Sequence, residues 1–390
     1  MADHPAINSP TIRFRRKIED FFGGGRCYAL AKGRVGLYVG LLAMDLPAGS
    51  KVIVPGYSCV VVPSAIKYAG LEPVYADIDP HTYNITPQSL REAHSEDVSA
   101  AIIQHTYGIP CAADEIFKWA EELSLPLIED CCHSFGSKTE GKLCGTLGSF
   151  SFMSGQWNKP FSTGLGGMLL VNDMQLAEKV DRVMDERSVP SGIPRNMLLR
   201  FQILVFEALV NPRTAGKITK LYRFLNKLGL VVGSSTEGEL IGEMPDDYLQ
   251  EMAPCQTKKG LRELARISQN IEQRGKLTAF YHERLQDTGF TPLNDALVAD
   301  QPLLRYPVRV SNKNEVVEAA ENRGFEIGTW FESPLHPEGT RLEDFGYIPG
   351  MCPEAERACR EVVNLPTHLK VDQKTAENTL AFLKEVGKPV

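Results

Sequence analysis

Short apolar runs and amphipathic segments alternate along the first third of the chain. Each apolar run is rich in β-branched or small residues and ends in polar or glycine positions, which is typical of a strand. The segments between the runs place apolar residues at helical spacing. This alternation predicts a mostly parallel sheet with helices on both faces. The expected strands are 51–58, 72–79 and 99–108, and the expected helices are 60–68 and 113–123.

Two later apolar runs, 125–128 and 168–171, also read as strands, and they enclose a polar loop. Glu129 and Asp130 stand at the carboxyl end of the first run, and Lys159 lies in the loop. Because ligands of open α/β sheets bind outside the carboxyl ends of the strands, such an acid and lysine can share one crevice. The pair suits pyridoxal phosphate, which forms a Schiff base with a lysine and has its ring nitrogen held protonated by a carboxylate. The same spacing also fits an ordinary surface lysine near a strand-end acid.

Composition excludes several other classes of protein. The 390 residues, 43% hydrophobic and 23% charged, are typical of a soluble chain that is long enough for two domains. A net charge of −7 argues against a nucleic-acid binder, and no apolar run is long enough to cross a membrane. The nine cysteines form no CxxC pair or His/Cys ladder, so we expect neither a metal site nor a disulfide framework. This cysteine usage and the polar leader predict a cytoplasmic protein.

The sequence around Lys159 narrows the choice. It reads IEDCCHSFG, then FSF, then KPFSTGLGG, with Lys159 five residues before Gly164. This pattern resembles the DegT/DnrJ/StrS family of pyridoxal-phosphate-dependent sugar aminotransferases, which adopt the aspartate aminotransferase fold type I. The resemblance implies an α/β chain with a large domain, whose mostly parallel sheet is flanked by helices, and a smaller C-terminal α+β domain. We place the large domain at 1–248, and the linker helix and small domain at 249–390.

The resemblance also assigns the residues that hold the cofactor phosphate. Relatives bind it at a G-T-A-A-L turn that opens a helix, and this chain has Gly33, Arg34 and Val35 at the matching positions. Arginine replaces a small hydroxyl residue there, which favours a stronger phosphate partner. Relatives also use a serine shortly before the lysine. Ser154 matches that serine, and Ser151 is its rival, because this chain carries extra residues between FSF and the lysine.

Two more positions concern the cofactor ring. An aromatic residue stacks on the ring in many relatives, whereas this chain has Cys59 at the matching position and Tyr57 two residues earlier. The sequence leaves open which of these side chains covers the ring. His133 matches a position that holds Gln or His near the ring oxygen in relatives, so it joins Lys159 and Asp130 as a candidate catalytic residue. A structural histidine is the alternative.

The C-terminal part resembles the family with one departure. FEIGTWFESPLHPEG and the anchor Leu365-Pro366 match segments that line the substrate side of the cleft in relatives. The segment DDYLQEMAPCQ lacks the asparagine with which relatives reach the phosphate of the other subunit's cofactor. The resemblance therefore implies a homodimer while leaving this cross-subunit contact in doubt.

Residues 190–245 have no counterpart in compact members of the family. The stretch from 197 to 210 is apolar nearly all round, and a basic amphipathic pattern follows it. Such a pair of helices, within 197–228, can lie at a membrane surface. A helical hairpin that packs on the body of the protein or on a partner subunit is the alternative. The basic residues of the pattern are Lys217, Lys220, Arg223 and Lys227.

The resemblance implies an aminotransferase that moves an amino group from L-glutamate to a keto sugar, nucleotide-linked, by a ping-pong mechanism, as in polysaccharide biosynthesis. One alternative is a sugar dehydratase, in which relatives have histidine in place of the lysine, and the presence of Lys159 argues against it. The other alternative is a membrane-associated scaffold that has lost activity. Intact Lys159, Asp130 and 164–167 argue against this second alternative.

Overall fold

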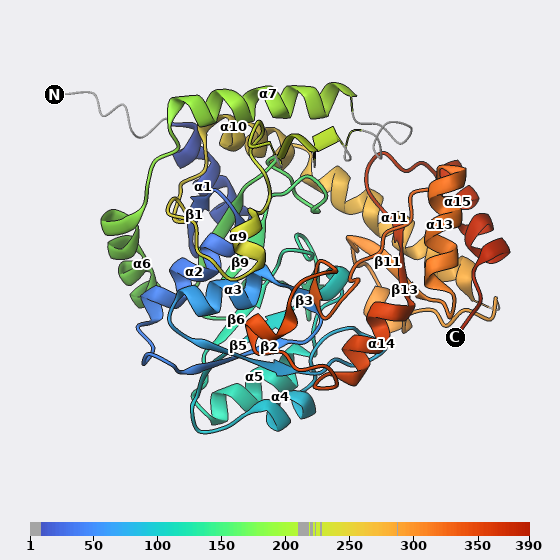
Figure 1. Cartoon of the computed structure of the whole chain (residues 1–390), viewed down its shortest axis with the longest axis horizontal. Helices are drawn as coiled ribbons and strands as arrows, with labels where there is room; N and C mark the ends of the chain where they lie inside the picture. Colours follow the sequence, from blue (N-terminus) through green and yellow to red (C-terminus); the bar gives the residue numbers. More distant parts are fainter. Residues whose placement is uncertain (1–8, 210–217, 219–220, 223, 227, 287) are drawn as a thin grey trace.

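The computed structural model describes residues 9–209, 218, 221–222, 224–226, 228–286 and 288–390. A seven-stranded sheet forms the middle of the molecule (Figure 1). Its strands run parallel except for β10, which is antiparallel to both of its neighbours. The strand order is β1 (Arg26–Leu30), β10 (Gly167–Val171), β9 (Phe150–Ser154), β6 (Leu127–Asp130), β5 (Val98–Gln104), β2 (Lys51–Pro55) and β4 (Glu72–Ala76).

Alternating side chains of the strands build a core on each face of this sheet. Within β5, for example, Ala100 and Ile102 pack on one face, and Ala101 and Ile103 pack on the other. The first face is covered by α2 (Gly33–Met44), α3 (Val61–Tyr68) and α6 (Met174–Arg187). The opposite face is covered by α1 (Pro10–Phe22), α4 (Pro87–Ala93), α5 (Ala113–Glu122) and α10 (Pro254–Leu264).

The C-terminal part builds a second, two-stranded sheet from β11 (Arg305–Arg309) and β13 (Val362–Pro366), which are antiparallel. A short parallel pair of strands, β3 (Ser58–Cys59) and β12 (Leu335–His336), joins the C-terminal part to the N-terminal part of the chain. The helices around the second sheet are α11 (Ile267–Leu285), α12 (Asp295–Val298), α13 (Lys313–Arg323), α14 (Pro353–Glu361) and α15 (Gln373–Val386).

The remaining elements are the strands β7 (Lys138–Thr139) and β8 (Lys142–Leu143), the helices α7 (Ile193–Leu209) and α9 (Glu237–Leu240), and the 3-10 turns η1 (Thr106–Gly108) and η2 (Leu342–Phe345). The long helix α7 lies across the top of the molecule in Figure 1. Of the described helices, none is both long and apolar enough to cross a membrane. The expected mostly parallel sheet with helices on both faces is confirmed, whereas the domain boundary at 248/249 stays a prediction.

Candidate active site

The N-terminus of α2 is fixed against the carboxyl end of β9 by two glycines. A Cβ atom added to Gly33 would lie 2.9 Å from the carbonyl oxygen of Met153, and one added to Gly167 would lie 2.2 Å from the Gly33 nitrogen. No larger residue fits at either position without moving the backbone. The start of the helix therefore lies beside Ser154, the last residue of β9.

Lys159 reaches the C-terminal part of the chain from the loop between β9 and β10. Its Nζ atom lies 4.5 Å from the ring centroid of Trp330, a distance at which a cation and an indole attract each other. The same indole stacks on the His133 imidazole, with the centroids 5.3 Å apart and the planes inclined by 6°. The lysine, the histidine and the tryptophan thus converge from three separate segments.

His133 is buried as a neutral imidazole. Burial, together with the positive charges of Lys159, Arg305 and His336, holds the pKa of His133 well below its usual value. Its Nδ1 atom accepts a hydrogen bond from the Tyr107 backbone N–H at 3.2 Å. In the neutral ring the proton therefore sits on Nε2, which makes that nitrogen a donor.

Asp130 ends β6 and is buried. Burial raises the pKa of its carboxyl group, and the Cys132 N–H and the positive charge of Lys159 partly offset that rise. The Cys132 N–H donates to Oδ1 at 2.9 Å. A buried carboxylate that faces a lysine is well placed to stabilise positive charge on a ligand between them.

Glu129 points to the other side of the strand, as the alternation of side chains predicts. It meets His105, whose Nε2 atom lies 3.1 Å from one carboxylate oxygen. With Cys131 these two residues are grouped closely enough to hold a metal ion. However, three backbone N–H groups already donate to the carboxylate, and the set therefore reads as a buried hydrogen-bond network. These donors, at 2.7–2.8 Å, belong to Gly145, Leu147 and Gly148.

Comparison with known proteins identifies the family of this chain. The DegT/DnrJ/EryC1/StrS aminotransferase family matches residues 8–192 and 214–384 of the chain. The chain belongs to this family. It is therefore an aminotransferase that depends on pyridoxal phosphate and has fold type I. The family match leaves 193–213 uncovered, a shorter stretch than the 190–245 expected from the sequence, and α7 lies in it.

Three similar proteins illustrate the range of the family. The GDP-perosamine synthase of Caulobacter vibrioides is 24% identical over 96% of this chain and 89% of its own length. The L-glutamine:2-deoxy-scyllo-inosose aminotransferase of Streptomyces fradiae is 33% identical over 47% of this chain and 43% of its own. The structure of NtdA from Bacillus subtilis with bound PMP superposes with a TM-score of 0.73 at 19% identity, covering 97% of this chain and 77% of that one.

The residues of this aminotransferase fit the cofactor. Helix α2 starts without a side-chain cap, so its first N–H groups suit the phosphate of pyridoxal phosphate. Asp130 supplies the buried acid, His133 supplies a ring N–H, and Lys159 supplies the amine. We propose these roles, together with a phosphate role for Ser154, from the arrangement of the residues.

Arg34 is engaged differently from what the sequence suggests. Its guanidinium is buried and forms an ion pair with Glu239, with Nε 3.0 Å from Oε1. It also donates to the Ser235 hydroxyl and to the Ser234 carbonyl. Lys32 joins the same acid at 3.2 Å, and burial and the Arg34 charge lower the pKa of Lys32 to about 8. The predicted phosphate contact of the Arg34 side chain would require this ion pair to open.

The alternatives left open by the sequence can be compared by position. Cys59 is half-buried, and burial raises the pKa of its thiol, on which the charges of Lys159 and Asp130 also act. The Tyr57 hydroxyl, by contrast, forms a hydrogen bond with the Tyr107 hydroxyl at 2.6 Å inside an aromatic cluster. The position of Cys59 supports it as the residue beside the cofactor ring.

Three other positions concern the phosphate. Ser151 donates to the Gly145 carbonyl and is fully buried, whereas Ser154 stands half-buried at the strand end beside α2. This favours Ser154 over Ser151 as the phosphate serine. The Val35 side chain lies in the core and its N–H donates to the Lys32 carbonyl at 3.2 Å, which leaves Val35 little to offer a ligand.

Trp330 and Arg305 were not among the candidate residues. Arg305 begins β11, and its Cζ atom lies 5.7 Å from the Trp330 ring centroid. The segment FEIGTWFESPLHPEG marks Trp330 as part of the substrate side, yet no local pattern says that this ring covers the lysine. Contacts between residues about 170 positions apart in the chain depend on the fold rather than on local spacing.

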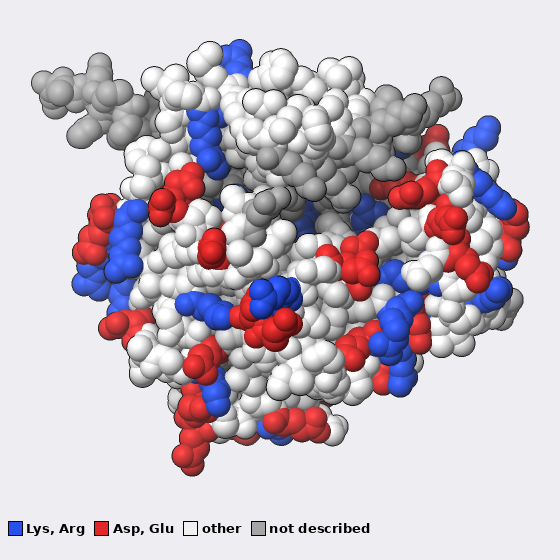
Figure 2. All heavy atoms as spheres, in the orientation of Figure 1, with Lys and Arg blue, Asp and Glu red and all other residues white. Residues whose placement is uncertain are grey.

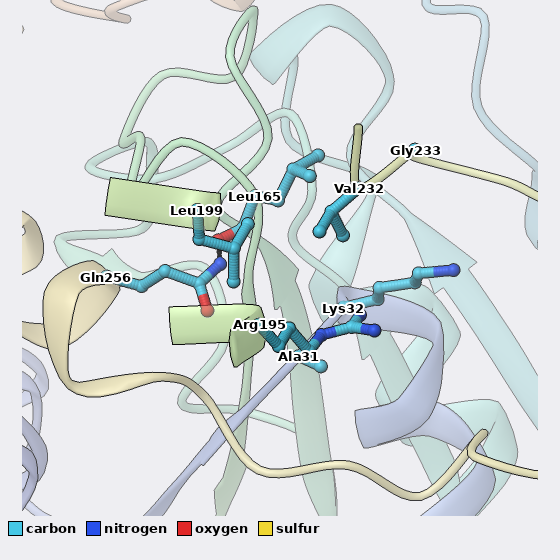
Figure 3. A pocket seen from close by; sticks show the side chains of 8 residues that line it. All are labelled: Ala31, Lys32, Leu165, Arg195, Leu199, Val232, Gly233 and Gln256. Atoms are coloured by element: carbon cyan, nitrogen blue, oxygen red, sulfur yellow. Dashed lines mark hydrogen bonds between the residues drawn. The ribbon is translucent and has the colours of Figure 1, made fainter. Parts of the chain in front are cut away.

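Helix α7 packs against the loop that carries Lys159. The rings of Trp157 and Phe206 stack with centroids 4.1 Å apart, and Leu165 packs with Leu199. Figure 3 shows the pocket beside this contact, where the Arg195 and Lys32 side chains lie next to each other below Val232 and Gly233. The inward face of α7 therefore supports the catalytic loop of this aminotransferase.

Proposed function

We propose that this aminotransferase moves an amino group from L-glutamate to the keto group of a nucleotide-linked sugar, in two half-reactions. The observation that carries the proposal is the convergence of Lys159, Asp130 and His133 at the carboxyl end of the sheet. Support for the acceptor comes from similarity to a GDP-perosamine synthase along nearly the whole chain. The Streptomyces fradiae relative makes L-glutamine and a cyclitol ketone the second pair to test.

Each residue has a distinct task in this reaction. Pyridoxal phosphate, when bound, supplies an aldehyde carbon for the amino group and a ring that takes up the electron pair from the substrate Cα. Lys159 holds the cofactor, and its amine, once released, takes a proton from the substrate Cα and returns it later. Asp130 keeps the ring nitrogen protonated. His133 donates its Nε2 hydrogen to the ring oxygen.

Chemical trapping tests the assignment of Lys159. Borohydride reduction of the loaded enzyme, followed by peptide mapping, should place the pyridoxyl group on Lys159. Lys159→Ala should lose both the label and turnover, while Lys142→Ala, at an exposed hairpin, keeps both. A label on another lysine would overturn the proposed site. Keto-sugar nucleotides and cyclitol ketones, each with L-glutamate and with L-glutamine, then identify the substrates.

We also propose that the protein acts as a cytoplasmic homodimer in polysaccharide biosynthesis, with domains at 1–248 and 249–390. The nine cysteines are free, which supports a reducing compartment. Sedimentation equilibrium measures the oligomeric state, and a monomer at micromolar concentration would contradict the dimer.

We further propose that α7 contacts an anionic membrane surface. Its outward face carries Ile193, Met197, Phe201 and Leu204, which are 57–76% exposed, and Figure 2 shows the largely uncharged surface at the top of the molecule. Basic residues complement the charge of such a membrane. They are Arg200 on α7 and, outside the described residues, Lys217, Lys220, Arg223 and Lys227.

Vesicle flotation tests this contact. The protein should float with vesicles that contain phosphatidylglycerol, less so as salt rises, and not with phosphatidylcholine alone. Phe201→Glu should abolish flotation. A protein that stays in the soluble fraction with both lipids, and that loses its dimer when 197–228 is deleted, would show that this segment is a subunit contact instead.

A further inference from the structure

Lys313, the first residue of α13, is a buried lysine that lies outside the group of reacting residues. It is 7% exposed. Its Nζ atom donates to the backbone carbonyls of Thr329 at 3.2 Å, Phe331 at 3.2 Å and Cys359 at 2.7 Å. An ammonium group has three N–H donors, so these carbonyls use its full hydrogen-bonding capacity. Within the described part of the chain its hydrogen bonds go to carbonyl oxygens and to no carboxylate.

This position is unfavourable for a positive charge. Burial lowers the pKa of Lys313, because the protein interior disfavours the charged form of the amine. The first turn of a helix also disfavours a cation, since the helix dipole is positive there. A buried charge of this kind contributes little net stability. A specific task for its three hydrogen bonds is therefore the better explanation of this lysine.

Two of the three carbonyls flank Trp330 in the chain. The peptide groups of Trp330 are held by other elements: its N–H donates to Oδ1 of Asn364 at 3.0 Å, and its carbonyl accepts from the Tyr107 hydroxyl. Lys313 holds the residue on either side of it. The main chain of 329–331 is thus fixed to α13, β13 and η1, which leaves the indole little freedom to shift.

This indole is also the ring that contacts the reacting residues. Its centroid lies 4.5 Å from the Lys159 Nζ atom. It lies 5.3 Å from the centroid of the His133 ring, with the planes inclined by 6°. A shift of the indole would therefore move one wall of the space around the amine that we propose moves the proton. A misplacement of about 1 Å in such a site can cost about 100-fold in rate.

We infer that Lys313 is a positioning residue of the aminotransferase reaction, which holds Trp330 against Lys159. It acts through the two carbonyls that flank the tryptophan. The alternative is a cap for α14, because Cys359 lies in the last turn of that helix, where a carbonyl suits a cation. The inference rests on the proposed function through the role of Lys159, and the position of the indole can be measured without any substrate.

A double-mutant cycle on the first half-reaction separates these two roles. Rapid mixing of the cofactor-loaded enzyme with L-glutamate measures the rate, and Lys313→Met should slow it about 10- to 100-fold. Trp330→Ala should slow it as well. Adding Lys313→Met to Trp330→Ala should then slow it less than about threefold further, because the residue through which the lysine acts is gone. Equal slowing by Lys313→Met in both backgrounds would overturn the inference and favour the helix cap.

Two further variants complete the cycle. Lys313→Arg keeps the charge but replaces the ammonium with a planar fork, so its rate should lie between those of Lys313→Met and the wild type. Arg309→Met is the matched control, because it breaks an ion pair with Glu361 at the end of α14 and leaves the tryptophan loop untouched. It should lower the melting temperature and leave the rate unchanged. A rate loss in Arg309→Met as large as in Lys313→Met would also favour the cap.

Tryptophan fluorescence of the full chain measures the position of the indole directly. Trp119→Phe and Trp157→Phe leave Trp330 as the single tryptophan. In this background Lys313→Met should raise the acrylamide quenching constant, whereas Arg309→Met should not. Unchanged quenching in Lys313→Met, or in Lys313→Arg if the methionine variant does not fold, would overturn the inference. Failure of the proposed function would appear differently, as raised quenching in Lys313→Met together with a wild-type enzyme that does not react with L-glutamate.

Discussion

Asp130 is the buried acid that we propose keeps the cofactor ring nitrogen protonated, and its charge can be removed at nearly constant shape. Asp130→Asn should slow the first half-reaction about 100-fold or more, because an electrostatic partner of a developing charge is lost. Rapid mixing with L-glutamate measures that rate. Glu129→Gln is the matched control, since this acid serves backbone donors on the opposite side of the strand, and it should lower the melting temperature more than the rate. Near-normal turnover by Asp130→Asn would assign the task to another acid.

We expect the free energy of unfolding to depend on pH through His133. Its folded pKa lies well below the value of about 6.5 for an exposed histidine, through burial and nearby positive charges. Below about pH 6.5 the unfolded chain binds a proton that the folded chain does not, so the free energy of unfolding falls as the pH drops. His133→Gln should therefore flatten the decline in melting temperature between about pH 7.5 and 5.5. His81→Gln, at an exposed turn, is the control, and equal slopes in wild type and His133→Gln would contradict this explanation.

At the scale of single residues, a candidate site residue can be predicted from the sequence where a local pattern fixes its position. Lys159 and Asp130 are predicted from a glycine spacing and a strand end, and in the structure the charge of Lys159 acts on the Asp130 carboxyl and lowers its pKa against the effect of burial. The side-chain direction of Arg34 could not be predicted, because its partner Glu239 lies within 190–245, the stretch for which the resemblance offers no counterpart. The positions of Trp330 and Arg305 near Lys159 depend on how the C-terminal part packs against the rest of the chain, which no local pattern predicts.

Helix α7 has two apolar faces, one packed against the body of the protein and one exposed. Its inward face holds the lysine loop through the ring pair of Phe206 and Trp157, while Phe201 is 64% exposed. Phe206→Ala should reduce the free energy of unfolding by about 0.5–1.5 kcal/mol from the ring pair alone. It should also speed limited proteolysis within 155–166, and Phe201→Ala should do neither. Equal protease sensitivity in the two variants would show that α7 does not support the loop.

The sequence could not predict which face of α7 packs against the protein. A segment that is apolar nearly all round carries no amphipathic stripe, so the pattern predicts a helix without saying which side is buried. The strands were more informative, because β-branched runs between polar positions mark buried parallel strands whatever their neighbours are.

For the whole molecule, the alternation of strands and helices was sufficient for the fold class but not for strand order. The parallel strands β2, β4, β5 and β6 follow from that alternation. The pairing of β1 with β10, the antiparallel strand of the seven-stranded sheet, involves segments about 140 residues apart, which no local pattern encodes.

This distant pairing has a consequence for the order in which the protein is made. In the seven-stranded sheet β1 is an edge strand that pairs with β10, and α1 packs on α10, which ends at Leu264. At about 5–20 residues per second, synthesis leaves the apolar side of α1 without α10 for roughly 10–50 seconds. Ribosome-stalled chains that end before α10 should therefore be cleaved within α1 by a brief protease pulse, and chains that extend well past Leu264 should be protected. Early protection would contradict this order and would mean that the contacts of α1 with earlier segments, such as the rings of Phe135 and Phe161, are sufficient.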